Sequence, residues 1–473
     1  MPGIWPEQVA APLRFLRPGQ VSLAALPPLS LYVHLPWCLK KCPYCDFNSH
    51  EVTAPRLPAV AIPRGGSQPT GGRGSAADDP ANHTGGSLDG ATEQRYLDAL
   101  VADLEAALPL IWGRRVISVF IGGGTPSLFS PSAIDRLLAD IRARLPLEPG
   151  CEVTLEANPG TFESDRFRAF RAAGVTRLSI GVQSFDDAAL RAIGRVHDAR
   201  QARAAVEEAA LAFDTFNIDL MYALPGQDLA GLQRDLDAAL SFAPPHLSIY
   251  HLTLEPNTAF ARRPPALPDD DLASEMLDLL VERTAERGLE RYEVSAFARS
   301  GHRCAHNLNY WQFGDYLGIG AGAHGKLSFP QRIVRQVRWR EPAAYMTQAL
   351  AGRPVSNEHE VTTNDLPFEF MLNALAARGL RTGLVRRAHR PVADRRRLGA
   401  GAGGRTWLAA ARGRSDRADG AWFRLSQRRA ATLPDRAGLT GAFGCVAGDV
   451  WAISSRSHSR SATRAGRSAC SGG

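Results

Sequence analysis

Six short runs rich in β-branched and apolar residues, separated by segments of helical character, constrain the fold more than any other feature of the sequence. The runs cover 31–35, 116–121, 152–156, 177–182, 216–222 and 247–252. Between the first two, Tyr96, Leu100 and Leu104 recur at helical spacing, and Ser130-Pro131 and Gly174 mark the expected start and end of further helices. Strands that alternate with helices favour a parallel sheet. The chain is therefore predicted to be an α/β protein, either an incomplete barrel or a doubly wound sheet.

Residues suited to chemistry follow the predicted strands in order. They are a cysteine cluster, a glycine run, Glu156, Gln183 and Asp219. In parallel α/β sheets the carboxyl ends of the strands meet at one edge, where ligands bind. We therefore expect these side chains to form one composite site.

The cysteine cluster has the spacing Cys38-x3-Cys42-x2-Cys45. The odd total of seven cysteines does not fit a disulfide framework. Thiolates suit zinc, copper(I) or iron–sulfur clusters, and no second cysteine pair lies nearby to complete a four-thiolate zinc site. Three thiolates can bind three irons of a [4Fe–4S] cluster and leave the fourth iron open. The alternative is a zinc site completed by His34 or His50.

The run Cys38-Leu-Lys-Lys-Cys42-Pro-Tyr44-Cys45 resembles the signature of the radical S-adenosylmethionine (radical SAM) superfamily. The run Gly122-Gly-Gly124-Thr125-Pro resembles the glycine motif of that superfamily. The resemblance implies a partial (β/α)6 barrel whose [4Fe–4S] cluster is held by Cys38, Cys42 and Cys45. It also implies that the open iron chelates S-adenosylmethionine, which the reduced cluster cleaves to methionine and a 5′-deoxyadenosyl radical.

Further blocks resemble the coproporphyrinogen-oxidase-like branch of this superfamily, from about residue 28 to 375. They are 31–38, 45–47, 155–159, 180–185, 218–226 and 306–311. By this similarity, the positions that contact S-adenosylmethionine are Tyr32, Tyr44, Gly124, Thr125, Glu156, Gln183, Arg195 and Asp219. Glu156 and Asp219 are suited to accept hydrogen bonds from its ammonium and ribose hydroxyl groups, and Arg195 to pair with its carboxylate.

Two positions separate the members of this branch. The oxygen-independent oxidase has a further cysteine two places after the third cluster ligand, where this chain has Phe47. The Cys-Asp-Phe form and His306-Asn-x-x-Tyr310-Trp311 instead resemble the HemW family of heme chaperones. That resemblance implies that the chain binds heme, with His306 as the axial ligand, and inserts it into respiratory hemoproteins. Tyr310 and Trp311 are expected to pack on the porphyrin, and Cys304 is an alternative thiolate ligand.

Three functions remain open on these residues. The first is the heme chaperone, which binds heme stoichiometrically. The second is an oxygen-independent coproporphyrinogen III oxidase, in which the radical abstracts hydrogen from a propionate side chain and carbon dioxide leaves. The third is a zinc-binding scaffold. A chaperone or an oxidase also implies an electron donor for the cluster, and a chaperone implies recipients that include membrane-bound hemoproteins contacted at the periphery.

Composition divides the chain into four parts. Residues 1–27 form an extension, 28–260 the radical SAM core, 261–375 a smaller α+β C-terminal region with the HNxxYW motif, and 376–473 an aberrant tail. Residues 51–91 are rich in glycine and proline, which predicts a disordered insertion. The tail has 20 arginines, no lysine and no glutamate, a bias typical of GC-rich codons translated out of frame. We hypothesise a frameshift, which resequencing the gene would test.

The tail also accounts for the basic charge of the chain. Its 20 arginines and five aspartates give it +15, so the +7 of the whole chain leaves −8 on residues 1–375. The predicted folded part is therefore acidic, and the high isoelectric point does not indicate a nucleic-acid partner. No apolar run reaches the 18 to 20 or so residues of a membrane helix, and the first residues lack the pattern of a signal peptide. A cytoplasmic location is expected.

Overall fold

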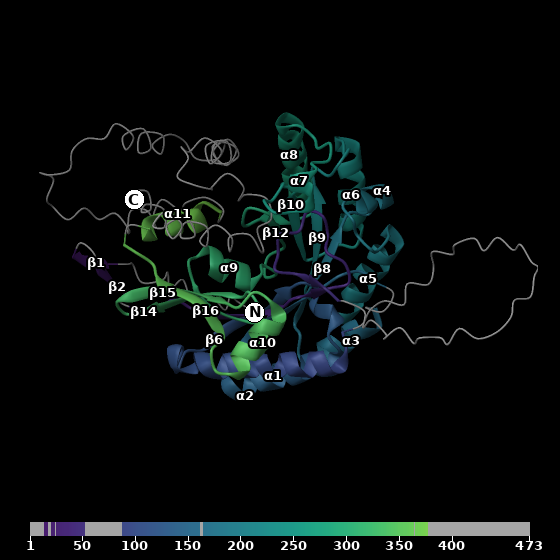
Figure 1. Ribbon diagram of the computed structural model, residues 1–473. Coiled ribbons are helices and arrows are strands. Elements are labelled where there is room, and N and C mark those ends of the chain that lie inside the picture. Colours follow the sequence, from purple (N-terminus) through teal and green to yellow (C-terminus); the bar gives the residue numbers. More distant parts are fainter. Residues whose placement is uncertain are drawn as a thin grey trace, which may run out of the picture.

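The computed structural model describes residues 14–17, 20–23, 25–52, 88–160, 164–363 and 365–376 (Figure 1). Most of the predicted extension, residues 53–87 of the predicted insertion and residues 377–473 of the predicted tail lie outside the described residues. Their character, including the frameshift, stays a prediction. The insertion is shorter than predicted at both ends, because Glu51 lies in a short strand and Gly90 begins a helix.

Six parallel strands form the centre of a twelve-stranded sheet and follow one another in chain order. They are β3 (Leu29–Leu35), β6 (Val116–Gly123), β7 (Leu147–Ala157), β8 (Arg177–Gln183), β9 (Phe216–Tyr222) and β10 (His246–His251). Each pairs in parallel with the next, as six strand–helix units require. The predicted strands are confirmed, and the α/β fold class with them.

Helices connect these strands, and wherever the structure describes the residue before the helix, an Asp or Ser side chain caps its start. They are α1 (Gly90–Ala107), α2 (Pro131–Arg144), α3 (Ser164–Ala173), α4 (Asp187–Ala192), α5 (Ala199–Ala212) and α6 (Leu229–Ser241). The Ser130 hydroxyl accepts a hydrogen bond from the Ala133 amide at the start of α2, and Pro131 occupies the first turn. Gly174 follows the end of α3 with φ +108°, a conformation that favours glycine.

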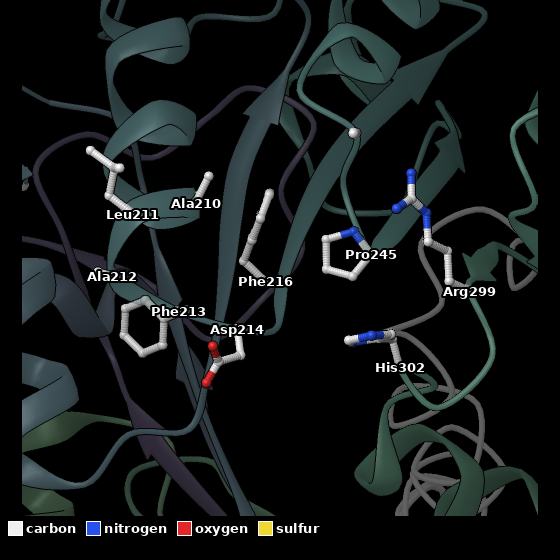
Figure 2. Close-up of a pocket in the computed structure, with 10 residues that line it drawn as sticks. Ala210, Leu211, Ala212, Phe213, Asp214, Phe216, Pro245, Arg299 and His302 are labelled. Carbon is white, nitrogen blue, oxygen red and sulfur yellow. The ribbon is translucent and has the colours of Figure 1, made fainter.

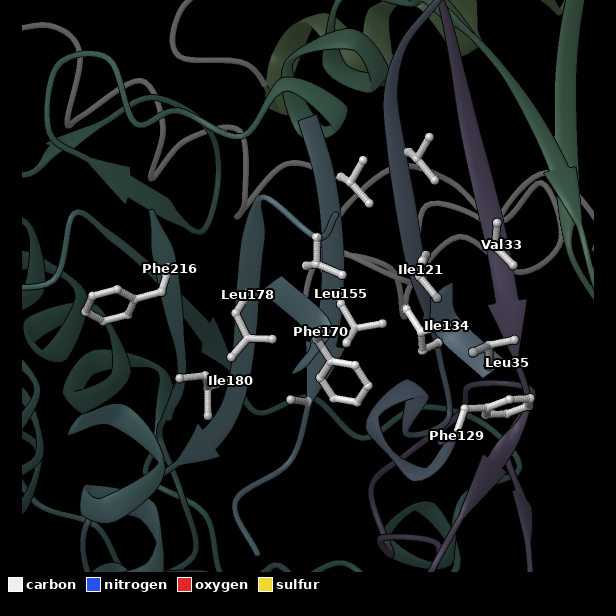
Figure 3. Packing of buried hydrophobic residues seen from close by; sticks show 14 of the residues in the cluster. Val33, Leu35, Ile121, Phe129, Ile134, Leu155, Phe170, Leu178, Ile180 and Phe216 are labelled. Atoms are coloured by element: carbon white, nitrogen blue, oxygen red, sulfur yellow. The ribbon is translucent and has the colours of Figure 1, made fainter. Parts of the chain in front are cut away.

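The two faces of the parallel sheet differ in character. Val33, Ile121 and Leu155 are fully buried on the face toward the helices, where Figure 3 shows them near Ile134 of α2 and Phe170 of α3. Each such side chain stabilises the fold by about 1.5–3 kcal/mol. Because side chains alternate along a strand, their neighbours face the other way, into the barrel. This inner face carries the polar residues described below.

The C-terminal region continues the same sheet at both edges. Beyond β10 lie β12 (Ala296–Ala298) and β11 (Glu290–Arg291), which follow α7 (Ala259–Arg262) and α8 (Asp270–Glu286). Beyond β3 lies β13 (Asp315–Ile319), parallel to it, and then the antiparallel strands β14 (His324–Phe329), β15 (Arg332–Arg338) and β16 (Val355–Glu360). The sheet is thus continuous across the predicted domain boundary at residue 260.

The remaining elements complete the C-terminal region. Helix α9 (Ala305–Trp311) precedes β13, and α10 (Pro342–Leu350) lies beside α1 (Figure 1). The other described elements are α11 (Leu366–Ala376) and the short strands β1 (Arg14–Arg17), β2 (Gln20–Ser22), β4 (Trp37–Cys38) and β5 (His50–Glu51). None of the described helices combines the length and apolar character that crossing a bilayer requires.

Buried ion pairs join the C-terminal strands to the barrel. Asp315 of β13 accepts hydrogen bonds from Lys326 at 2.9 Å and from Arg114 at 2.8 Å. Asp103 of α1 pairs with Arg338 of β15 at 3.0 Å. Both carboxylates are fully buried and paired with at least one cation, so this joint is electrostatically complete.

Candidate functional site

The three clustered cysteines lie on one folded loop. Cys38 ends β4, and the loop returns to β5, which pairs with β4 in parallel. Inside the loop the Cys45 amide donates to the Cys42 carbonyl at 3.1 Å. The Lys41 ammonium donates to the Phe47 carbonyl at 3.0 Å. These bonds fold ten or so residues so that all three thiols occupy the same turn-rich segment.

Each cysteine sulfur has a polar neighbour. Thr125 Oγ1 donates to Cys38 Sγ at 3.5 Å, and Arg195 Nη1 donates to Cys42 Sγ at 3.6 Å. Ser49 Oγ lies 3.7 Å from Cys45 Sγ. Burial raises the pKa of Cys45 to about 12, and the nearby Cys42 and Cys38 sulfurs add to this rise. Three neighbouring sulfurs that accept hydrogen bonds suit the iron ions of an iron–sulfur cluster. Such hydrogen bonds help to set the reduction potential of a cluster.

The arrangement fits a cluster better than a single ion. No group of three or more His, Cys, Asp or Glu side chains in the described ranges is placed to hold one metal ion. A [4Fe–4S] cluster makes a different demand, because each thiolate binds its own iron. His34, one of the two histidines that the zinc alternative offers, uses both ring nitrogens: Nδ1 lies 2.9 Å from Tyr32 Oη and Nε2 lies 3.0 Å from the Asn48 carbonyl. His50 Nε2 lies 3.3 Å from Asn48 Oδ1.

The glycine run packs directly against the cysteine loop. The Gly124 amide donates to the Leu35 carbonyl at 2.8 Å, and the Thr125 amide donates to the Trp37 carbonyl at 2.7 Å. A Cβ at Gly124 would lie 2.5 Å from the Trp37 carbonyl oxygen, so a larger residue cannot occupy this position without backbone movement. The run therefore brings Thr125 against the sulfur of Cys38.

Two partly buried carboxyl groups lie on the inner face beside the glycine run. Glu156 Oε2 accepts a hydrogen bond from the Gly123 amide at 3.0 Å. Asp219 accepts from Ser179 Oγ at 2.9 Å and from Asn217 Nδ2 at 2.7 Å. Burial raises the pKa of Glu156 to about 8, with a further rise from Asp219, and burial raises the pKa of Asp219 to about 6. A ligand with a positive charge and hydroxyl donors would relieve both effects.

Arg195 links the carboxyl ends of β7 and β8 to the cysteine loop. Besides Cys42, its guanidinium donates to Asn158 Oδ1 at 2.5 Å and to the Gly181 carbonyl at 2.6 Å. Its Nε is buried without a hydrogen-bond partner. Although burial opposes its charge, the neighbouring Tyr44 and Cys42 raise the pKa of Arg195 above its usual value. Tyr44 also packs on Phe260, at 6.4 Å between ring centroids.

Gln183 and Asn158 complete this edge. Gln183 ends β8 with φ 70°, a left-handed conformation that is uncommon for a residue with a Cβ. Asn158 follows β7, donates from Nδ2 to Thr125 Oγ1 at 2.7 Å, and accepts from Arg195. Asn158 was not among the predicted site residues. Its place in the block Glu156-Ala-Asn-Pro at a strand end was the available signal.

His306 lies deeper on the inner face. Its imidazole stacks on Phe120 of β6 at 4.8 Å between ring centroids and lies 6.3 Å from the ring of Tyr32. Phe120 pairs in register with Thr154, two residues before Glu156 on β7, so His306 lies one step toward the amino ends of the strands. Its Nδ1 is buried without a hydrogen-bond partner, and burial lowers the pKa of His306 to about 4. The imidazole is therefore neutral.

The neighbours of His306 are less open than the sequence suggests. Trp311 is buried, with its ring edge-on to that of Tyr310 at 5.3 Å, whereas Tyr310 is partly exposed. Cys304 Sγ donates to Glu152 Oε1 at 3.4 Å. Burial and the charge of Glu152 raise the pKa of Cys304 far above its usual value, which disfavours the thiolate.

The structure thus brings the cysteine loop, Gly124, Thr125, Glu156, Gln183, Arg195 and Asp219 to the carboxyl edge of the parallel strands. A separate pocket of about 330 Å³ lies at the opposite edge, where Figure 2 shows Asp214 and Phe216 near the start of β9, with Pro245, Arg299 and His302 facing them. The composite site expected at the carboxyl ends is therefore distinct from this pocket.

Known proteins match the chain over most of its described length. Residues 32–239 match the Radical SAM superfamily. "Heme chaperone HemW" of Escherichia coli K12 is 44% identical over 353 residues, which cover 74% of this chain and 83% of that protein. The HemW of Haemophilus influenzae is 44% identical over 354 residues, covering 74% and 82%.

A solved structure shares the fold. Coproporphyrinogen III oxidase (HemN) from Escherichia coli, described as a radical SAM enzyme, matches with a TM-score of 0.59 and 24% identity, over 76% of this chain and 78% of that one. At this identity the likeness concerns the fold alone. The level of identity to the two chaperones goes further: this chain belongs to the HemW family of the radical SAM superfamily.

Proposed function

We propose that this chain is a heme chaperone that binds a [4Fe–4S] cluster, S-adenosylmethionine and heme, and delivers heme to respiratory hemoproteins. The observation that carries the proposal is the 44% identity to the Escherichia coli heme chaperone over 83% of that protein. The arrangement of the side chains supports it. The cysteine loop suits the cluster, the inner-face carboxyl groups and Arg195 suit S-adenosylmethionine, and His306 suits heme.

Cys38, Cys42 and Cys45 are the cluster ligands in this proposal. When bound, the cluster supplies an open Lewis-acidic iron and an electron. Thr125 and Arg195 donate to two of the sulfurs, and such donors stabilise thiolate charge. Gly124 keeps the backbone close enough for this contact.

S-adenosylmethionine would lie between the cysteine loop and the inner-face carboxyl groups. Glu156 and Asp219 would accept from its ammonium and hydroxyl groups, and its positive charge would favour ionisation of these two partly buried carboxyl groups, which have no ion pair in the described chain. Arg195 retains one unpartnered N–H for the carboxylate of the ligand. The contact set that the family resemblance implies is completed by Tyr32, Tyr44, Gly124, Thr125 and Gln183.

His306 is the proposed heme ligand. A neutral imidazole with an unpartnered nitrogen is the form that binds heme iron. Because the ring lies inside the barrel against Phe120, heme must reach it through the barrel or through displacement of α9.

Hemin titration of the protein tests this ligand. We expect a Soret band at one heme per chain that shifts or is lost in His306→Ala. Cys304→Ser tests the thiolate alternative, and His359→Ala, on β16, controls for adventitious binding. A Soret band that is unchanged in His306→Ala and altered in Cys304→Ser would contradict the assignment.

The second candidate function is an oxygen-independent coproporphyrinogen III oxidase, because the chain shares the fold of HemN. Phe47 stands where that enzyme is expected to have a cysteine. The discriminating experiment incubates the anaerobically reconstituted protein with coproporphyrinogen III and S-adenosylmethionine. We expect no protoporphyrinogen IX above background, and its formation would support the oxidase instead.

The proposal extends to the cellular setting. A cytoplasmic location, an electron donor for the cluster and peripheral contact with membrane-bound recipients belong to it. Nucleic acid does not belong to it, since residues 1–375 carry a net charge of −8.

A further inference from the structure

Helix α9, which carries His306, is capped by the barrel. Its N-cap residue, Cys304, makes no side-chain hydrogen bond to the first turn. Instead the Cys304 amide donates to the Tyr292 hydroxyl at 3.2 Å, and the Ala305 amide donates to Glu152 Oε1 at 2.8 Å. The position of the helix therefore depends on groups outside it.

The Tyr292 hydroxyl continues into a buried chain of hydrogen bonds. Tyr292 Oη lies 2.8 Å from His246 Nε2, and His246 Nδ1 lies 2.6 Å from Asn217 Oδ1. Asn217 Nδ2 donates to Asp219 Oδ1 at 2.7 Å. Tyr292, His246 and Asn217 are each at most 4% exposed. This chain, Tyr292–His246–Asn217–Asp219, is called the relay below.

The donors and acceptors of the relay have a fixed order. An ionised Asp219 only accepts, so Asn217 donates from its amide nitrogen and accepts at Oδ1. His246 must then carry its proton on Nδ1, which leaves Nε2 to accept from the Tyr292 hydroxyl. The Tyr292 oxygen is left to accept from the Cys304 amide. Every donor therefore points toward Asp219, and the dipoles reinforce one another.

Resting on the proposed function, we propose that Asn217, His246 and Tyr292 are positioning residues that couple occupation of the S-adenosylmethionine site at Asp219 to the placement of helix α9. A ligand that donates to Asp219 holds its carboxylate ionised and oriented. The aligned relay then polarises the Tyr292 oxygen, which strengthens its bond to the Cys304 amide. The relay gives the heme motif a connection to a cofactor bound at the carboxyl ends of the strands.

Hydrogen–deuterium exchange of the reconstituted protein tests the coupling without relying on heme. We expect S-adenosylmethionine to slow exchange in residues 304–312 by about fivefold or more, the lower end of common allosteric couplings. Tyr292→Phe removes only the hydroxyl that joins the relay to α9. In this variant the ligand should still bind, but the slowing at 304–312 should vanish.

Tyr345→Phe is the matched control. The Tyr345 hydroxyl likewise donates to a buried side chain, Asp103 Oδ2 at 2.9 Å, and accepts from a backbone amide, that of Gly320 at 3.1 Å. We expect this variant to lose similar stability and keep the ligand effect on α9. No ligand effect in the native chain, or an effect that survives Tyr292→Phe, would overturn the proposal. Neither result bears on heme binding, which the His306→Ala titration tests separately.

Discussion

The barrel edge and the joint to the C-terminal strands bury the same kind of group in opposite ways. At the joint, Asp315 is paired with Lys326 and Arg114, and Asp103 with Arg338. At the barrel edge, Glu156 and Asp219 are held by uncharged donors, and no ion pair joins either of them to a cation in the part of the chain that the structure describes.

The pKa values express this difference. Burial opposes ionisation at Asp315, but Lys326 and Arg114 outweigh it and lower the pKa below its usual value. At Glu156, burial raises the pKa to about 8, and Asp219 adds to the rise. The joint is thus electrostatically complete without a ligand, whereas a cationic ligand would complete the barrel edge. Carboxyl groups without a cationic partner lower the stability of the ligand-free chain, as expected for a site that binds a positively charged ligand.

Removing a cluster thiolate should have the largest effect, and this effect should be confined to the barrel edge. In Cys42→Ala we expect loss of most cluster iron and sulfide and of measurable S-adenosylmethionine binding, because an iron lacks its ligand. Iron analysis and equilibrium dialysis measure this. Cys151→Ala, a half-buried cysteine of β7 away from the loop, is the control and should retain both. Equal iron in the two variants would contradict the cluster assignment.

Breaking the joint should instead cost stability. Lys326→Met leaves Asp315 buried with one partner fewer, and removal of one member of a buried pair costs about 3–5 kcal/mol. Denaturant unfolding measures the loss, while the iron content of the folded protein should not change. A loss below about 1 kcal/mol would show that the joint is not the electrostatic anchor inferred here.

Neutralising a barrel-edge carboxyl should separate binding from stability. In Glu156→Gln we expect S-adenosylmethionine to bind about tenfold or more weaker, equivalent to about 1.4 kcal/mol. The free energy of unfolding of the ligand-free chain should stay level or rise, since an unpaired buried carboxyl is removed. Asp103→Asn at the joint is the matched change and should lower stability. If both variants were destabilised alike, the contrast between the regions would fail.

The most gradual effect should be on the pH dependence of stability. The folded-state pKa of Glu156, about 8, lies above its ordinary value of 4.5, so between these pH values the folded chain holds a proton that the unfolded chain releases. Its contribution to stability is therefore present below this window and declines as the pH rises toward 8. Unfolding measured from pH 5 to 8 should show this decline. Glu156→Gln should flatten it, and an unchanged slope would argue against the raised pKa.

Local patterns predicted the barrel well. The strand at 216–222 was predicted with its observed bounds. Ser130 caps the start of α2 and Gly174 follows the end of α3, as expected, because caps and alternation are properties of neighbouring residues. The parallel pairing of β13 with β3 was not foreseen, since it joins segments almost 300 residues apart that share no local signal.

The same reason limits prediction of the site. The strand-end rule gathered Glu156, Gln183 and Asp219, but not Asn158, whose role depends on contacts with Thr125 and Arg195. The relay through His246 and Tyr292 was missed entirely, because the bonds of His246 to Asn217 and to Tyr292 each join residues from different segments of the chain. The family resemblance predicted His306 as a site residue. Only the structure shows that its ring lies inside the barrel, over Phe120.

Transfer of heme tests the central claim most directly. The reconstituted, heme-loaded chain would be mixed anaerobically with a respiratory hemoprotein stripped of its heme, and the Soret bands of the two proteins followed after separation. We predict that heme moves to the recipient and that His306→Ala, loaded under the same conditions, delivers less. Retention of heme by the native chain, with the recipient left empty, would contradict a chaperone function.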